Sequence, residues 1–200
     1  MPITFQGGMK TTAWHDIEDL QNLTKNEFKY KNDTRKLITA LIDKEVKDKG
    51  IDPRRIMLGG FSQGAAMAIY TGLQYPHRLG GIVALSGYLC DLNLVSNIKD
   101  NEMKKTPIVM FHGAQDMIVQ TQYGRMSAMA LKANGFNDTV WEEFNIPMQL
   151  NFGHNVVPQE LQKVAQFVAK HLPKNYKAAK KPQDEEKSDD KPMKIGPELD

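Results

Sequence analysis

The chain has 200 residues, of which 40% are hydrophobic and 25% are charged, a composition typical of one globular domain. Its net charge of +2 gives no case for nucleic acid as the main partner. The single cysteine, Cys90, excludes an internal disulfide and fits a reducing compartment. Residues 1–8 do not resemble a signal peptide and no apolar run has transmembrane length, so we expect a cytoplasmic protein.

The first third of the chain predicts loops followed by one helix. Residues 1–30 look irregular, with at most one short helical turn. Asn32 or Asp33 can cap a helix that runs to about Lys49, where Gly50 and then Pro53 prevent its continuation. The apolar side chains of this helix that recur at helical spacing are Leu37, Ala40, Leu41 and Val46.

The remainder alternates between apolar strands and helices. Four short apolar runs predict buried strands, at residues 56–58, 81–86, 107–112 and 139–146. Helices are expected over 63–75, over 122–134 and from Pro158 to about Leu172, with residues 91–105 as polar loop. The alternation predicts an α/β fold with a mostly parallel sheet flanked by helices on both faces.

Two of these helices carry an apolar stripe that should face the sheet. In the helix over 122–134 the stripe consists of Tyr123, Met126, Met129, Ala130 and Ala133. In the last helix it consists of Leu161, Val164, Ala165, Val168 and Leu172.

The most informative stretch is Gly60-Phe61-Ser62-Gln63-Gly64, between the first predicted strand and the helix that follows it. Strand, G-x-S-x-G and helix, in that order, are the context of a nucleophile elbow. The two glycines remove bulk on either side of the serine, and Ala65 and Ala66 allow close packing of the helix. The alternative is a glycine-rich turn with an incidental serine, which the strand and helix context disfavours.

A serine nucleophile needs a base and an acid, which in α/β-hydrolases follow it in the order acid, then histidine. Asp116 lies just past the third predicted strand, although taken alone it could be a helix cap or a turn aspartate. His154 lies on the loop before the last helix. The interpretation is that His154 takes the proton from Ser62 while Asp116 fixes the tautomer of the imidazole.

The remaining polar groups are expected to have supporting roles or no role in the reaction. The backbone N–H of Gln63 would be one oxyanion donor. His112 is expected to shape the loop that holds Asp116, whereas His15 and His77 are expected on the surface. No metal-ligand spacing is found.

Taken together, these motifs resemble those of one enzyme family. Leu58-Gly59-Gly60-Phe61-Ser62-Gln63-Gly64-Ala65, the run from His112-Gly113-Ala114-Gln115-Asp116 to Val119, and Gly153-His154 with Glu160-Leu161 resemble the acyl-protein thioesterase, or lysophospholipase, family of α/β-hydrolases. The resemblance covers residues 2–172. It implies hydrolysis of fatty acyl thioesters on S-acylated proteins, or of lysophospholipid and simple carboxyl esters. It also implies no cofactor and no nucleic-acid partner, with transient contact with membranes.

This sequence departs from the family's pattern in two places. Family members carry further strands and a His-Gly loop with the second oxyanion donor upstream of the region seen here. We therefore expect an N-terminally truncated hydrolase domain over residues 1–172, without that second donor. The composition of residues 173–200 separately predicts a disordered charged tail, because this lysine- and acid-rich stretch has too little apolar surface to offset the entropy of ordering. The segment 146–152 is longer than the family's usual link before its Gly-His, and our hypothesis is that it alters the acyl-chain entrance.

Two functions remain open at this point. The first is a serine hydrolase, favoured by the complete Ser62, Asp116 and His154 set. The second is a catalytically silent family fragment that acts as a lipid-binding or regulatory module, favoured by the expected loss of the second oxyanion donor.

Overall fold

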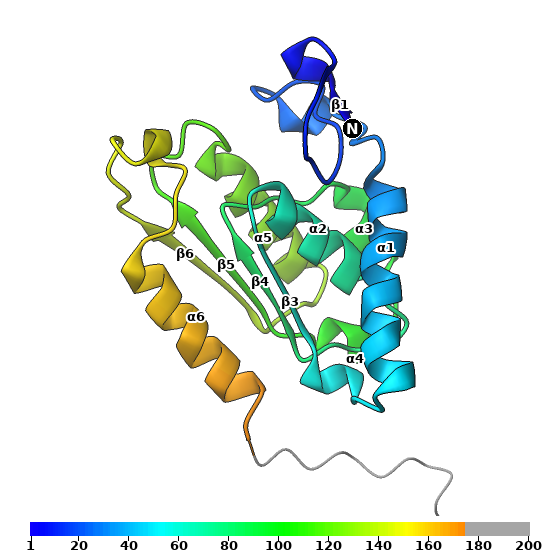
Figure 1. Cartoon of the computed structure of the whole chain (residues 1–200). Helices are drawn as coiled ribbons and strands as arrows, with labels where there is room; N and C mark the ends of the chain where they lie inside the picture. The colour runs from blue at the N-terminus through cyan, green and yellow to red at the C-terminus, as the bar shows by residue number, and fades with distance from the viewer. Residues whose placement is uncertain (175–200) are drawn as a thin grey trace, which may run out of the picture.

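A four-stranded parallel sheet organises the chain (Figure 1), as the sequence predicts. The computed structural model describes residues 1–174, so the predicted disordered tail lies outside the described residues apart from its first two positions. The strand order follows the chain order, and the strands are β3 (Met57–Phe61), β4 (Gly81–Leu85), β5 (Ile108–Gly113) and β6 (Thr139–Phe144). A separate small hairpin pairs β1 (Pro2–Ile3) with β2 (Met9–Lys10).

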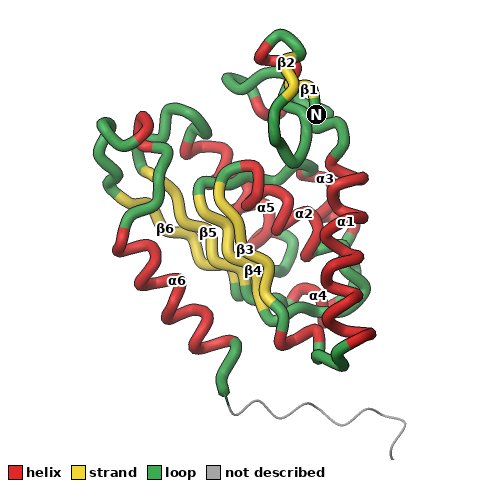
Figure 2. Tube along the Cα trace, in the orientation of Figure 1, coloured by secondary structure: helices red, strands yellow, loops and turns green. Residues whose placement is uncertain are grey.

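Helices cover both faces of the sheet (Figures 1 and 2), as expected for parallel strands. They are α1 (Lys31–Asp43), α2 (Gln63–Gly72), α3 (Leu92–Asn97), α4 (Asn101–Lys104), α5 (Thr121–Ala133) and α6 (Pro158–His171). A π-helical turn, Lys44–Asp48, continues α1. Short 3₁₀ turns occur at Thr4–Gln6, Leu23–Lys25, Pro53–Arg55 and Asn151–Gly153.

Alternate side chains of the central strands enter two different cores. On one face, Ala84 of β4 and Met110 of β5 pack with α2 and α5. On the other face, Leu85 and Phe111 pack toward α6. The period-2 alternation of strand side chains therefore joins both helical layers to one sheet.

The segment predicted as polar loop, residues 91–105, instead contains α3 and α4, so this prediction was wrong. Asp91 caps α3 by accepting the N–H of Asn93, and Asp100 caps α4 by accepting the N–H of Glu102. Aspartate before a short run is a helix-start signal, and buried Val95 of α3 and Met103 of α4 attach these helices to the core.

The helix spans were predicted well, and the predicted apolar stripes were right only in part: Tyr123 of α5 is buried and Val164 of α6 packs against the core. In α1, Leu37 and Leu41 are exposed, whereas Thr34 and Ile42 are buried. In α6, Leu161 and Val168 are exposed, and the side chains that turn inward are Glu160, Val164 and Phe167. In α5, Met126 and Met129 are exposed, whereas Ala128 and Leu131 are buried. Each helix offers two overlapping apolar stripes, and only the tertiary contacts select one of them.

Strand β3 is less buried than its apolar run predicts. Gly59 and Phe61 are exposed, and within residues 1–174 the strand pairs only with β4. One edge of β3 is therefore open in the part of the chain that the structure describes.

Candidate active site

Ser62 stands at a sharp turn between β3 and α2. Its backbone adopts φ 56° and ψ −123°, a conformation that a residue other than glycine rarely takes. The Ser62 N–H donates to the carbonyl of Leu85 at 2.9 Å, so the turn stays attached to the end of the neighbouring strand. Strained backbone held by surrounding structure is typical of functional sites and of nucleophile elbows in particular.

Of the two glycines that flank Ser62, Gly60 has a steric reason, whereas a Cβ on Gly64 would make only an ordinary contact, 3.6 Å from Nε1 of Trp14, so the steric prediction was wrong for Gly64. A Cβ on Gly60 would lie 2.2 Å from the carbonyl carbon of Gly64, so the turn cannot close around any larger residue. A Cβ on Gly87, in the loop after β4, would lie 2.5 Å from the Cβ of Ala65. Small residues thus let the start of α2 pack directly against the ends of β3 and β4.

Asp116 and His154 form a buried pair at the same end of the sheet. Nδ1 of His154 lies 2.6 Å from Oδ2 of Asp116, and both side chains are almost fully buried. The other oxygen of Asp116, Oδ1, accepts the N–H groups of Ile118 at 2.9 Å and Val119 at 2.8 Å. With Nδ1 donating to the carboxylate, Nε2 of a neutral His154 is free to accept a proton.

The loops that carry the pair are in backbone contact. A Cβ on Gly113 would lie 2.4 Å from the carbonyl oxygen of Gly153, and Gly153 itself has φ 78°. The N–H of Met117 donates to the carbonyl of Phe152 at 3.1 Å. These contacts join the loop after β5 to the loop before α6, and they bring the acid to the base across 38 positions of sequence.

The imidazole of His154 also packs beside the elbow. The ring of Phe61, the residue before Ser62, lies 4.5 Å from the His154 ring between centroids, at an interplanar angle of 36°. The structure therefore brings the residues predicted as nucleophile, acid and base to one end of the sheet.

His112, near the end of β5, supports the Asp116 loop, as the sequence predicted. Its Nε2 lies 2.8 Å from the carbonyl of Val119, to which it can donate, and 3.5 Å from Oδ2 of Asp116. Burial lowers the pKa of His112 below its usual value, which favours the neutral ring. Its Nδ1 faces Gly124, where a Cβ would lie only 2.5 Å away.

His15 was predicted on the surface, and this prediction was wrong. The side chain is fully buried, whereas His77 is exposed as expected. Nδ1 of His15 lies 2.9 Å from the Asp16 carbonyl and Nε2 lies 3.2 Å from the Tyr88 hydroxyl. Burial lowers the pKa of His15. No local pattern could have found this, because Tyr88 is 73 positions away.

Gln63 occupies the first position of α2, so its N–H belongs to the helix start, where backbone donors have no acceptor within the helix. Its side chain turns to the N-terminal segment: Oε1 accepts the N–H of Trp14 at 3.1 Å, and Nε2 donates to the carbonyl of His15 at 3.2 Å. No local sequence pattern predicts these contacts, because Trp14 and His15 lie 49 and 48 positions before Gln63.

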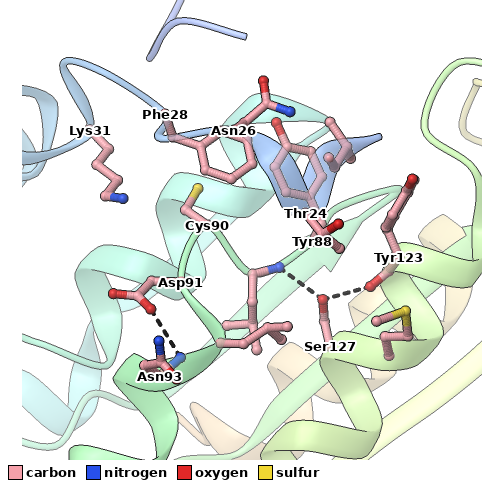
Figure 3. A pocket seen from close by; sticks show the side chains of 14 residues that line it. Thr24, Asn26, Phe28, Lys31, Tyr88, Cys90, Asp91, Asn93, Tyr123 and Ser127 are labelled. Atoms are coloured by element: carbon pink, nitrogen blue, oxygen red, sulfur yellow. Dashed lines mark hydrogen bonds between the residues drawn. The ribbon is translucent and has the colours of Figure 1, made fainter. Parts of the chain in front are cut away.

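A cavity of about 420 Å³ lies between the N-terminal segment, the loop after β4 and α5 (Figure 3). Its wall combines apolar groups, such as Phe28 and Tyr88, with the polar side chains of Lys31 and Asn93. Cys90 also lines it, with its pKa raised to about 12 by burial. Tyr88 connects the cavity to the elbow region, because its hydroxyl contacts His15.

Residues 1–174 contain neither a metal-binding cluster nor a membrane-spanning helix. Within residues 1–174, no group of three or more His, Cys, Asp and Glu side chains is placed to hold a metal ion. In that same part of the chain, no helix is long and apolar enough to cross a membrane.

Comparisons with known proteins identify the family. The family model described as Phospholipase/Carboxylesterase matches residues 1–172. Acyl-protein thioesterase 1 of Gibberella zeae is 38% identical over 185 residues, which cover 86% of this chain and 74% of that protein. Acyl-protein thioesterase 1 homolog 1 of Dictyostelium discoideum is 36% identical, covering 86% and 73%.

Solved structures agree with this assignment. SOBER1 of Arabidopsis thaliana has a TM-score of 0.75 at 27% identity, covering 86% of this chain and 79% of that one. Acyl-protein thioesterase 2 of Zea mays has a TM-score of 0.68 at 28% identity, covering 86% and 77%. The chain belongs to the phospholipase/carboxylesterase family of α/β-hydrolases.

Proposed function

We propose that the chain is a serine hydrolase that cleaves fatty acyl thioesters and carboxyl esters, with Ser62, His154 and Asp116 as its catalytic triad. The observation that carries the proposal is the buried Asp116–His154 hydrogen bond beside the strained Ser62 turn. The names of the relatives, acyl-protein thioesterases, support the acyl substrate class. The family match over residues 1–172 supports that range as the hydrolase domain.

In the proposed reaction, Nε2 of His154 takes the proton of the Ser62 hydroxyl as Oγ attacks the acyl carbon. The negative charge that forms on the acyl oxygen is stabilised by the N–H of Gln63. Collapse of the tetrahedral intermediate breaks the bond to sulfur or oxygen, and His154 returns the proton to the leaving thiolate or alkoxide. Water then attacks the acyl-enzyme by the same route, which releases the fatty acid and restores Ser62.

The substrates we propose are S-acylated proteins, lysophospholipids or related acyl esters. The side chains of Leu150, Phe152 and Met117 are exposed on the loops that carry His154 and Asp116. We propose that the segment 146–152 borders the entrance for the acyl chain. The buried, unpaired Cys90 supports a reducing, cytoplasmic setting, and acylated substrates would bring the protein into transient contact with membranes.

The test is labelling of the 200-residue chain with a serine-reactive fluorophosphonate, alongside turnover of a palmitoyl thioester. Labelling and turnover should be lost in Ser62→Ala, and turnover should fall at least 1,000-fold in His154→Ala, because the nucleophile then lacks its base. A folded parent protein that is neither labelled nor active would contradict the proposal and favour a silent lipid-binding module.

A further inference from the structure

We propose that Gln63 is a positioning residue whose side chain clamps the Trp14–His15 backbone and thereby fixes the direction of its own N–H at the elbow. The inference rests on the proposed function, in which that N–H stabilises the oxyanion. It adds a role for the carboxamide of Gln63, which is distinct from the backbone donor.

The clamp uses both ends of the carboxamide. Oε1 accepts from the N–H of Trp14 and Nε2 donates to the carbonyl of His15. The two peptide groups belong to an irregular segment that lies outside the strands of the sheet. A side chain held at both its donor and its acceptor cannot rotate about its last bond, so these two contacts restrain Gln63 more than either one alone.

The clamped segment is itself anchored. The His15 ring is buried, with Asp16 and Tyr88 at its two nitrogens. The adjacent carboxylate of Asp16 accepts from the backbone N–H of Thr4 at 2.7 Å and from its hydroxyl at 2.6 Å. These contacts come from the loop after β4 and from the N-terminal segment. Gln63 therefore bonds to a backbone segment that is itself held in place.

The elbow needs such support because the side chains of its own residues make few contacts that could hold the turn in place. Ser62 is in strained backbone, and Gly64, directly after Gln63, has no side chain to pack. Donors at an oxyanion site must be held within a fraction of an ångström, since loss of one such donor costs roughly 100- to 1,000-fold in rate and a shift of about 1 Å can cost about 100-fold. A clamp one side chain away from the donor meets this need.

The experiment compares Gln63→Met with Gln74→Met. Methionine keeps the length of glutamine and removes both hydrogen bonds. Gln74 follows α2 directly and its side chain donates to the Tyr70 carbonyl, far from Ser62 in sequence, so it is a matched control. The readouts are kcat and KM for an acyl ester, hydrogen exchange at the Trp14 amide, and the unfolding midpoint.

In Gln63→Met, kcat should fall about 10- to 100-fold while KM changes less than about twofold, since the loss is confined to the transition state. The Trp14 amide should exchange at least about tenfold faster, because it loses its acceptor. Gln74→Met should keep parental kcat and parental exchange at Trp14.

The outcomes separate the two proposals. A parental kcat in Gln63→Met, with an active parent enzyme, overturns this inference alone. Unchanged exchange at Trp14 overturns the clamp itself, whatever the activity. An inactive parent overturns the proposed function and with it the catalytic part of the inference. Equal losses of kcat in both methionine variants, with lowered unfolding midpoints, would show a merely structural effect and would also overturn the inference.

Discussion

Oδ2 of Asp116 lies 2.6 Å from Nδ1 of His154, and the remaining carboxylate oxygen is occupied by two backbone N–H groups of its own loop. The carboxylate is thus fixed from two sides before any substrate binds. This arrangement lets the loop after β5 impose one orientation and one tautomer on an imidazole from a distant loop.

Asp116→Asn should reduce kcat by about 10,000-fold with little change in folding. The asparagine oxygen can still accept from Ile118 and Val119, but its NH₂ group would face Nδ1 of His154 and favour the wrong tautomer. Turnover and fluorophosphonate labelling measure the loss. The control is Asp100→Asn, which changes a capping aspartate of α4. Comparable losses in both variants would contradict a specific role for Asp116.

Gly124→Ala tests how His112 supports the same loop. A new Cβ would lie 2.5 Å from Nδ1 of His112 and 2.7 Å from the ring of Trp141, so one of the buried rings must move. Overpacking of this kind costs about 1–3 kcal/mol of unfolding free energy. Because His112 bonds to Val119 beside Asp116, kcat should fall as well.

Urea unfolding and turnover check this prediction, with Gly59→Ala as the control. A Cβ on Gly59 would lie 3.6 Å from Val83, an ordinary contact, so its cost should be smaller. Equal stability of the two variants would show that His112 has room to move.

The sequence was sufficient to predict the position of those site residues that depend on local steric rules. Gly60 marks the elbow because no larger residue fits the turn there, and Asp116 could be placed because it lies just past an apolar strand. His15 could not be placed. Its burial depends on Phe28 and Tyr88, which reach it from other parts of the fold. The buried faces of α1 and α6 were mispredicted for the same reason. Leu37 and Leu161 are as apolar in sequence as the side chains that are buried, yet both are exposed.

The buried histidines predict a loss of stability in acid. Burial lowers the pKa values of His15 and His112 below the ordinary value of 6.5, so the unfolded chain binds protons that the folded chain does not. The stability contribution is therefore present above pH 6.5 and is lost as the pH falls from 6.5 toward the lowered folded pKa values. Each group can contribute a slope of up to about 1.4 kcal/mol per pH unit in that window.

Urea unfolding at pH 7.5, 6.5 and 5.5 measures this slope for the parent chain and for His15→Phe. Phenylalanine keeps the aromatic contacts with Phe28 and Tyr88 and removes the titrating group. The variant should lose less stability than the parent between pH 6.5 and 5.5. Identical slopes in the two proteins would contradict the lowered pKa of His15.

The last prediction concerns the segment 146–152. Deleting residues 147–150 should change the acyl-chain length that is cleaved fastest, because exposed Leu150 would be lost and the loop that carries exposed Phe152 would be shortened. Turnover of a series of acyl esters from four to sixteen carbons, a range of about 10 kcal/mol in transfer free energy at roughly 0.8 kcal/mol per CH₂, gives the preference. The point variant Leu150→Ala, which keeps the loop's length, should shift the preference in the same direction by a smaller amount. If both proteins fold and retain the parental order of chain lengths, the segment does not border the acyl-chain entrance.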